Sequence, residues 1–368
     1  MSADGQRLLK EHLRRRAGTY WGAARDVSDV RLLRTMDRPA ARLFWYEVQD
    51  GVARREIVAK VHTGAGHGHS EAVRALRPAE GYMPDRYARE VAALTALNRH
   101  FSLIADARYG TIPILDAIPE VQAIITERIV GTPMTRLFLR ASILHPRTSR
   151  VLWEAITHAG AWLREWHSVQ LPNLVTRRSS RAEFLDLVGR HCEFVGRASG
   201  DAHALDDLRS VTAQAADRHF PADLPLAVGH GDFAMRNIIV QRSGEVIVFD
   251  TLGVWRAPIF EDLATFVLGA RLFRPQAYLS GLLFPEADLD RVEQRLLRGY
   301  AGGVGDVGTA QIDLYSVLLL LDKWASVLAP LGNRSRGRIR TRLLTRWYAG
   351  EAKRLVRRIA ANLSRNSR

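Results

Sequence analysis

The chain has 368 residues, of which 47% are hydrophobic and 25% are charged, the composition of a globular protein long enough for two lobes. Its single cysteine, Cys192, excludes an internal disulfide framework and favours a reducing cytoplasm. Residues 1–16 are polar and basic without the apolar segment of a signal peptide, and the longest apolar run, residues 317–321, is too short to cross a bilayer. We therefore expect a cytoplasmic protein, soluble or peripheral to a membrane. The formal net charge of +14 points to an anionic partner or substrate.

The first part of the chain has the patterns of a small β-rich lobe. Residues 1–28 are predicted to be a basic helical extension. Strand-like alternation follows over residues 29–36, 42–48 and 57–62, with a turn before the third strand. A glycine- and histidine-rich loop leads to a helix that opens at Asp85 and has apolar residues at helical spacing. Residues 109–115 and 121–125 are predicted to complete this lobe, which we place at residues 29–131.

After residue 131 the pattern becomes helical. Apolar residues recur at helical intervals in several segments, namely residues 151–170, two stretches within 173–222, 265–300 and 312–328. Two short apolar strands interrupt them at residues 237–240 and 245–250, joined by a turn that contains Gly244. The segments together predict an α+β protein whose helical lobe spans residues 132–330. Cys192 lies in a helical segment and is expected to be a small buried side chain.

The segment from His230 to Asp250 carries the strongest chemical signal. It reads His-Gly-Asp, four residues, Asn237, and then a strand that ends in Asp250. In phosphoryl transfer one Asp orients the acceptor hydroxyl, and an Asn and a second Asp hold Mg²⁺ against the nucleotide phosphates. An isolated His-Gly-Asp could equally be a turn in which Asp232 and Asn237 cap the local backbone. Three elements in this order and spacing favour phosphoryl transfer.

This segment resembles the catalytic segment of the aminoglycoside phosphotransferase/choline kinase family, whose pattern is His-Gly-Asp, four residues, Asn, and an Asp that closes the next strand. The downstream residues 257–264, Ala-Pro-Ile-Phe-Glu-Asp-Leu-Ala, are similar to the Pro…Asp-Leu-Ala element of that family. The resemblance covers Asp29 to about Tyr300. It implies a two-lobed protein-kinase-like fold, with a small antiparallel β lobe, a larger mainly helical lobe, and ATP in the cleft between them.

The resemblance also implies roles for the residues of this segment. Asp232 would be the catalytic residue that orients the acceptor hydroxyl, and Asn237 and Asp250 would hold Mg²⁺. His230 and Asp262 would support the catalytic loop, Asp262 by capping its backbone. Two further residues have open roles. Arg236 could contact phosphate or form an ion pair, and His167, at the end of the 151–170 helix, is expected to be a packed structural histidine.

Nucleotide contacts follow from the same resemblance. Residues 58–61 are similar to the kinase strand that carries a phosphate-binding lysine, here Lys60. Glu90, in the next helix, would hold Lys60 towards the α- and β-phosphates of ATP. Glu71 is a rival that lies nearer in the sequence, but the residues around Glu90 match the family better.

Residues 123–133 resemble the hinge between the lobes of kinase-like folds. By position, Thr126 would be the gatekeeper, and the Glu127 carbonyl and the Ile129 amide would contact adenine. One departure from the kinase pattern is the expected phosphate-covering loop, Thr35–Arg42, which has no glycine. Glycines normally allow backbone amides to approach phosphates closely, so Arg38 or Arg42 would have to supply the charge. The loop therefore leaves the choice between ATP and GTP open. The histidines of the following loop lack the fixed surroundings of a metal site; they are His62, His67 and His69.

The best function hypothesis is an ATP- and Mg²⁺-dependent transfer of the γ-phosphate to a small-molecule hydroxyl. A protein acceptor is disfavoured because only eleven residues separate Asp250 from Asp262, too few for a regulated activation loop. A non-catalytic nucleotide-binding scaffold with a basic interaction tail is the alternative from another class, and nucleic-acid binding is disfavoured because no such motif is present. Arginines near the expected acceptor pocket favour a neutral or anionic sugar-like or lipid-linked acceptor over an aminoglycoside or choline-type one.

Residues 331–368 are predicted to form a basic amphipathic C-terminal helix. From Gly332 to Arg368 there are twelve Lys or Arg residues and one acid, Glu351. Glu351 is expected to interrupt the apolar row that runs from Ile339 to Leu363, beside a second row that includes Leu344 and Tyr348. The helix would pack partly on the large lobe. Its cations would either face water or meet an anionic membrane through residues 334–368; they are Arg342, Arg346, Lys353, Arg354, Arg357 and Arg358. The oligomeric state stays open.

Overall fold

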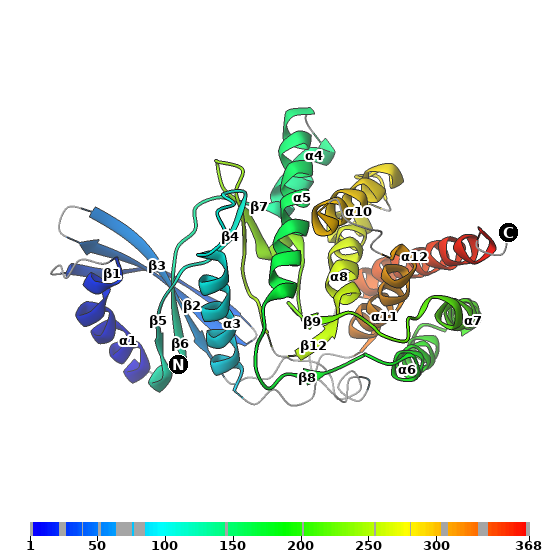
Figure 1. The fold of residues 1–368 in the computed structure, drawn as a ribbon, viewed down its shortest axis with the longest axis horizontal. Helices are drawn as coiled ribbons and strands as arrows, with labels where there is room; N and C mark the ends of the chain where they lie inside the picture. Colours follow the sequence, from blue (N-terminus) through cyan, green and yellow to red (C-terminus); the bar gives the residue numbers. More distant parts are fainter. Residues whose placement is uncertain are drawn as a thin grey trace.

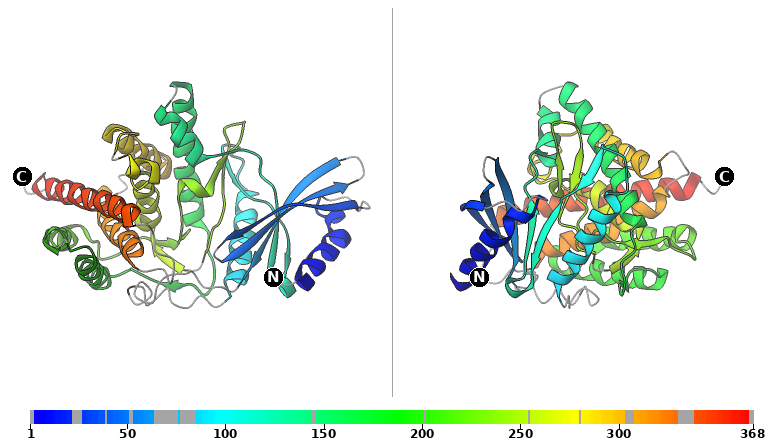
Figure 2. Two further views of the ribbon diagram at one scale, coloured as in Figure 1. Left: turned by 180° about the vertical axis from the view of Figure 1, so that it is seen from behind. Right: turned by 60° about the vertical axis from the view of Figure 1, so that its left-hand side comes forward.

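The structure, a computed structural model, has two lobes arranged along its longest axis (Figure 1). A five-stranded antiparallel sheet forms most of the small lobe, and helices form most of the large one. The N-terminus lies beside the sheet and the C-terminus at the opposite end of the molecule, as both views in Figure 2 also show. The fold is therefore the predicted two-lobed α+β arrangement. The residues that the structure describes are 3–21, 27–38, 40–50, 53–63, 76, 85–143, 146–200, 202–253, 255–279, 281–302, 308–329 and 338–365.

The five-stranded sheet has helices on both faces. Its strand order is β1-β2-β3-β6-β5, with β1 Val27–Arg38, β2 Ala41–Asp50, β3 Ala53–His62, β5 Ile114–Ile118 and β6 Ala123–Glu127. Because side chains alternate along a strand, Ala123 and Ile125 belong to the core that includes Leu9 of α1 (Ala3–Arg16), whereas Ile124 faces the main core with Leu94 of α3 (Arg86–Phe101). The helix α3 starts at Asp85, whose carboxylate accepts a hydrogen bond from the Ala88 amide.

The strand β4 (Tyr109–Thr111) lies in a different sheet from the predicted one. It pairs in parallel with β11 (Val246–Val248), and the four-stranded order is β4-β11-β10-β7, with β7 Thr132–Pro133 and β10 Ile238–Val240. The prediction that residues 109–115 complete the small-lobe sheet is therefore wrong for β4 and correct for Ile114 onward. The apolar alternation identified a strand, but alternation does not specify which partner a three-residue strand selects.

The large lobe packs helices around one continuous core. Its helices are α4 Met134–Ile143, α5 Pro146–Ser168, α6 Arg181–Ser199, α7 Ala202–His219, α8 Ile259–Arg271, α9 Arg274–Tyr278, α10 Glu286–Ala301, α11 Thr309–Leu328 and α12 Arg338–Arg365. Single 3₁₀ turns occur at Ala17–Thr19, Pro119–Val121 and Met235–Asn237. A three-stranded sheet, β8-β12-β9, connects the lobe's first helices to α8; its strands are β8 Val175–Thr176, β12 Trp255–Pro258 and β9 Leu226–Val228. None of the helices so described is long and apolar enough to span a bilayer.

Two glycines fix how α5 crosses α10. A Cβ atom on Gly160 would lie 2.1 Å from the Leu296 carbonyl oxygen, and one on Gly299 would lie 1.8 Å from the Thr157 carbonyl oxygen. Only glycine fits at either position, so the two backbones can touch. This close approach brings His167 at the end of α5 to Tyr300 at the end of α10.

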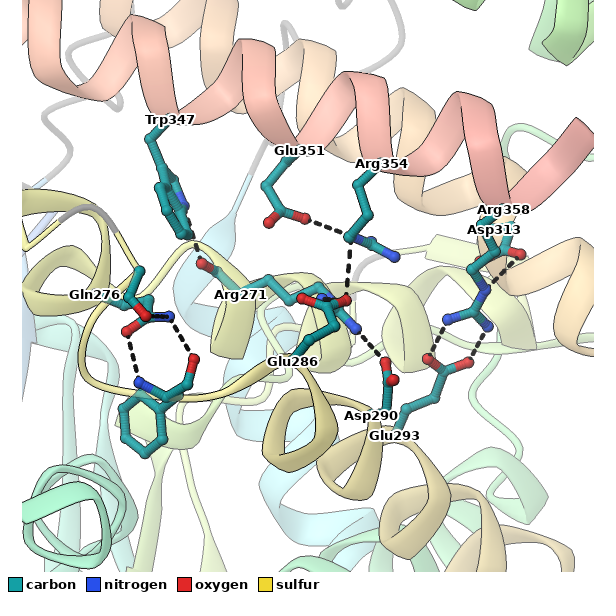
Figure 3. A network of polar contacts seen from close by, with 12 residues as sticks. Arg271, Gln276, Glu286, Asp290, Glu293, Asp313, Trp347, Glu351, Arg354 and Arg358 are labelled. Atoms are coloured by element: carbon teal, nitrogen blue, oxygen red, sulfur yellow. Dashed lines mark hydrogen bonds and ion pairs between the residues drawn. The ribbon is translucent and has the colours of Figure 1, made fainter.

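The C-terminal helix α12 docks on the large lobe through both apolar and charged contacts (Figure 3). Its buried apolar residues are Leu344, Tyr348, Ala352, Leu355 and Ile359. Glu351 is also buried and accepts a hydrogen bond from Arg354 at 2.8 Å, so it belongs to the docked face and is not an interruption of it. Ile339 is 76% exposed, because the docked face takes Leu344, Tyr348 and Ala352 from the second predicted row and only later residues, Leu355 and Ile359, from the first.

Two of the six cations predicted to flank the apolar stripe are only partly exposed and form ion pairs with acidic side chains. Arg358 donates to Glu293, with Nη1 2.6 Å from Oε2, and its Nε lies 2.9 Å from Asp313 Oδ2 (Figure 3). Arg354 lies 3.9 Å from Glu286 in addition to its contact with Glu351. The sequence prediction was wrong for these two arginines, because they stabilise the docking of α12 instead of facing outward.

Cys192 gives a simple test of the packing. Burial raises the pKa of its thiol to about 12, so little thiolate forms near neutral pH. We expect the native protein to resist a thiol reagent at pH 8 and to react stoichiometrically once guanidinium unfolds it. Fast labelling of the native protein, monitored by absorbance, would contradict the buried position of Cys192.

Candidate functional site

A β-hairpin brings two of the predicted site residues to one end of a sheet. The strands β10 and β11 pair antiparallel, with Ile238 opposite Val248. Because Asn237 immediately precedes β10 and Asp250 follows β11, antiparallel pairing places them at the same end of the hairpin. The Phe249 amide donates to the Asn237 carbonyl at 3.0 Å, which fixes this end. Asp250 has a φ of +62°, a left-handed backbone conformation that turns the chain directly after the strand.

Asp232 lies next to Asn237 and is held by it. The Asn237 amide nitrogen donates to the Asp232 carboxylate at 2.9 Å and to the Asp232 backbone carbonyl at 2.9 Å. These two bonds use the amide nitrogen and leave the Asn237 side-chain oxygen on the other side. Arg236 donates to the second oxygen of the Asp232 carboxylate. Of the two roles considered for Arg236, an ion pair is therefore the one that the structure contains.

The loop that carries Asp232 is anchored by Asp262 on α8. The buried Asp262 carboxylate accepts hydrogen bonds from the His230 amide at 2.6 Å and from the Gly231 amide at 3.2 Å. His167 Nε2 lies 3.2 Å from the same carboxylate, and its Nδ1 lies 2.8 Å from the Tyr300 hydroxyl. Burial acts to raise the pKa of Asp262, but the hydrogen bond and charge of His167 lower it below its ordinary value.

His230 is buried in the large lobe, and its ring contacts the backbone of the loop that carries Asp232. Its ring lies edge-on to Trp162 and to Phe233, with centroid distances of 5.8 and 5.5 Å. The Asp232 amide donates to His230 Nδ1 at 3.3 Å. Burial lowers the pKa of His230, which keeps the ring neutral and Nδ1 able to accept this bond. His230 therefore positions Asp232 through the backbone.

Lys60 on β3 connects the small lobe to Asp250, which follows β11. Its Nζ lies 2.6 Å from Glu90 Oε1 and 2.6 Å from Asp250 Oδ1. Burial acts to lower the pKa of Lys60, yet the two carboxylates raise it above its ordinary value. Burial likewise acts to raise the pKa of Asp250, and Lys60 counteracts this strongly enough to bring it to about 2. The three groups are therefore all charged near neutral pH.

Glu90 has a second neighbour that the sequence patterns did not assign. His62 Nε2 lies 3.2 Å from Glu90 Oε2, and the His62 ring packs edge-on to Tyr87 at 6.0 Å. The signal for this was present, because residues 60 and 62 face the same side of a strand. His67, His69 and the rival carboxylate Glu71 lie outside the described residues.

The predicted hinge begins within β6, which contains Thr126 and Glu127. Thr126 pairs with Val58 in the ladder and its hydroxyl donates to the Val58 carbonyl at 3.4 Å. Outside the strand ladders, no hydrogen bond between described residues uses the Glu127 carbonyl or the Ile129 amide. The Arg128 amide between them donates to the Glu56 carbonyl at 3.0 Å. Because Glu127 itself pairs with Ile57 in the β3–β6 ladder, the Ile129 amide is the one of these two groups that remains available to a ligand.

The expected phosphate-covering loop is mostly strand. The β1–β2 ladder continues to the pair Arg38–Ala41, so only the tip at residues 39–40 connects the strands. Arg42, one of the two cations considered for phosphate contact, forms an ion pair with Asp37 across the ladder. The prediction of a loop over Thr35–Arg42 was therefore wrong in length, because the alternating side chains on both strands extend the ladder. Arg38 remains exposed at its end.

Most of the chain matches a known protein family. Residues 46–310 match the model of the phosphotransferase enzyme family. The chain belongs to this family. The match includes the β3 lysine, the helix α3, the hinge and the whole segment from Asp232 to Asp262. No curated protein matches the chain.

Solved structures of this phosphotransferase fold have low sequence identity to the chain. A choline/ethanolamine kinase family protein from Mesorhizobium loti is 14% identical, with a TM-score of 0.54 over 95% of this chain and 94% of its own. Spectinomycin phosphotransferase, solved with ADP and spectinomycin, is 13% identical, with a TM-score of 0.54 over 95% and 98%. A choline kinase from Streptococcus pneumoniae is 12% identical, with a TM-score of 0.52 over 96% and 99%. These similarities establish the fold.

Proposed function

We propose that this phosphotransferase moves the γ-phosphate of ATP to a hydroxyl of a small molecule in a Mg²⁺-dependent reaction. The observation that carries the proposal is the position of Lys60, with Nζ 2.6 Å from carboxylates of both Glu90 and Asp250. This contact joins β3 and α3 of the small lobe to the strand end that also presents Asn237. A phosphate-binding lysine, its partner glutamate and a metal-binding aspartate have the same relation in phosphoryl-transfer sites.

The side chains near Asp250 fit Mg²⁺. The available donors are oxygens, from the Asp250 carboxylate and the Asn237 amide, and Mg²⁺ prefers oxygen ligands. The described residues contain no cluster of three acidic, histidine or cysteine side chains that could hold a metal. This also fits, since Mg²⁺ in such sites is completed by water and substrate phosphates. When bound, the ion would neutralise charge on the transferred phosphoryl group.

Some residues of the chain would orient the acceptor, and others would bind the charged phosphates of the nucleotide. Asp232 would accept the acceptor hydroxyl's hydrogen bond and hold its oxygen in line with the γ-phosphorus. Lys60 would exchange its contact with Asp250 for the nucleotide phosphates while Glu90 keeps it extended. Asp262 and His230 would keep the loop rigid, and Thr126, Glu127 and Ile129 would surround and bind adenine.

The principal experiment tests activity and separates a kinase from a silent scaffold. Purified protein would be mixed with γ-labelled ATP and Mg²⁺ and screened against sugars, amino alcohols, nucleosides and aminoglycosides. We expect label transfer to at least one hydroxyl compound and a thermal shift with Mg·ATP. A thermal shift without transfer to any acceptor, and without ATP hydrolysis, would favour the scaffold with a basic interaction tail.

The acceptor is proposed to be neutral or anionic. Arg236 contacts the Asp232 carboxylate and is more than half exposed, so a cation stands where an acceptor would approach. This guanidinium would repel a polycationic substrate. Arg181, Arg190 and Arg197 of α6, which are among the arginines predicted to lie near the acceptor pocket, contribute less, since each forms an ion pair on the surface of the protein.

We therefore predict that kanamycin-type aminoglycosides are poor acceptors. In a coupled assay their kcat/KM should lie well below that of the best neutral or anionic acceptor. The Arg236→Gln variant is the matched test. Removing this cation should reduce the difference in kcat/KM between aminoglycosides and the best neutral or anionic acceptor. Efficient phosphorylation of an aminoglycoside at micromolar KM by the unmodified protein would contradict the charge argument.

Peripheral attachment to an anionic membrane through residues 334–368 remains a proposal. Fewer cations are available for it than the sequence predicted. Arg354 and Arg358 are committed to internal ion pairs, which leaves the exposed Arg342, Arg346, Lys353 and Arg357 of the predicted set. Each cation close to an anionic surface contributes about 1 kcal/mol. A lipid-linked acceptor would be consistent with such attachment.

A further inference from the structure

A pocket of about 650 Å³ lies at the far end of the large lobe, where α6, α11 and α12 meet. Its walls include Ser199 at the end of α6, Trp324 and Leu328 near the end of α11, and Arg342, Arg346 and Lys353 on α12. The three helices converge at the end of the molecule opposite the small-lobe sheet (Figure 1). None of the α12 residues that make the docking contacts of Figure 3 lines the pocket.

The charged side chains that line the pocket are all positive. Three cations line it, and no acidic side chain among the described residues does. The described residues also contain no ion-pair partner for Arg342, Arg346 or Lys353, whereas Arg354 and Arg358 on the same helix have partners at 2.8 and 2.6 Å. Cations gathered around one hollow without a counter-charge favour an anion there.

Two buried hydrogen-bonding groups in the pocket wall support this assignment. Trp324 is 1% exposed, and its indole nitrogen has no hydrogen-bond partner among the described residues. The Thr345 hydroxyl, about one turn from Arg342 on α12, is also buried and has no hydrogen-bond partner among the described residues. Both groups can donate a hydrogen bond, which an oxygen of a bound anion would accept.

Gly350 keeps the pocket open at a cost to the helix. It lies in the interior of α12, where glycine stabilises a helix less than alanine does. A Cβ atom there would meet no atom within 4 Å, so packing does not require glycine at this position. Because Gly350 lines the pocket, a side chain would project into the space that a ligand would fill.

We propose that this pocket is a second ligand site, which binds a phosphate-bearing compound. Arg342, Arg346 and Lys353 would hold the phosphate, and Trp324 and Leu328 would contact an apolar part of the same ligand. The site is separate from the catalytic one. The helix α6 begins beside the catalytic segment, where the Arg178 amide donates to Glu183 and Arg178 lies near Glu261. It reaches the pocket at its other end, roughly 25 Å away at 1.5 Å per residue.

The test compares two triple variants with the same change in charge. R342Q/R346Q/K353Q removes the cations of the pocket, and R340Q/R357Q/R365Q removes three exposed cations of α12 outside it. Two probes distinguish the source of the phosphate. Inorganic pyrophosphate, titrated calorimetrically in EDTA, represents a soluble compound, and phosphatidylglycerol/phosphatidylcholine vesicles, measured by co-sedimentation, represent a lipid headgroup.

We expect the pocket triple variant to weaken binding of at least one probe by about tenfold or more, and the control variant to change it by less than about twofold. Gly350→Leu should weaken the same probe while the Tm stays unchanged or rises. Asp232→Asn should leave this binding unchanged, so the result does not depend on the proposed kinase activity. If the pocket triple variant loses binding of pyrophosphate, the ligand is a soluble compound. If it loses binding of the vesicles alone, the ligand is a lipid.

Three results would overturn the proposal. Equal losses in the two triple variants would mean diffuse attraction to a basic helix. Binding that none of the pocket variants changes would place the probe elsewhere, for example at Lys60. Binding of neither probe to the unmodified protein would leave the pocket without its assigned ligand class.

Discussion

Asp232→Asn is expected to lower kcat by about 10²- to 10⁴-fold while nucleotide binding stays nearly unchanged. The substitution keeps the shape of the side chain and an oxygen that can accept from Asn237, which now lies 2.9 Å from the carboxylate. It removes the charge that accepts and orients the acceptor's proton and, with that charge, the ion pair with Arg236. A loss confined to kcat, with KM for ATP unchanged, is the pattern of an interaction made in the transition state.

The measurement needs one control for the charge change and one for the nucleotide. Asp207→Asn makes the same change at an exposed position on α7 and should leave kcat unaltered. The Kd of Mg·ATP, from calorimetry, should agree between Asp232→Asn and the unmodified protein within about threefold, since direct contacts with the nucleotide are proposed for Lys60 and the hinge. A kcat within tenfold of the unmodified enzyme would remove Asp232 from the catalytic role.

The local geometry of the candidate site was predictable from residue spacing. An Asn directly before one short strand and an Asp directly after the next must share one end of an antiparallel hairpin, and Asn237 and Asp250 do. The ion pair of Lys60 with Glu90 likewise required only a strand followed by a helix of the right pattern. The family match over residues 46–310 then covers all of these elements.

The features that sequence reasoning missed depend on long-range packing. β4 has only three residues, so its partner is set by how α5 and β11 pack, which alternation does not encode. The exposure of Ile339 and the burial of Glu351 were missed because both rows of α12 are apolar enough to dock. The docked face combines parts of both rows and includes the pairing of Arg358 with Glu293, 65 residues earlier in the chain, and periodicity within one helix does not contain that information.

The contact between Lys60 and Asp250 determines how the proposed metal would affect nucleotide binding. Asp250 is the more exposed of the two carboxylates on Lys60, with 36% of its side chain accessible against 4% for Glu90. With its pKa at about 2, it is ionised throughout the neutral range. Without a metal, Asp250 therefore neutralises part of the charge that Lys60 would offer to phosphate and adds a repulsive charge of its own.

Asp250→Ala should consequently abolish the effect of Mg²⁺ on nucleotide affinity and leave the metal-free affinity unchanged or higher. The Mg·ATP Kd should rise by about a hundredfold or more, because the proposed metal loses its one charged protein ligand. The Kd for ATP in EDTA should not rise, because Lys60 is released from one carboxylate. Lys60→Met is the matched comparison, and it should weaken binding in both conditions. Calorimetry with and without Mg²⁺ gives the ratio of the two constants. A ratio in Asp250→Ala equal to that of the unmodified protein would show that the metal is held elsewhere.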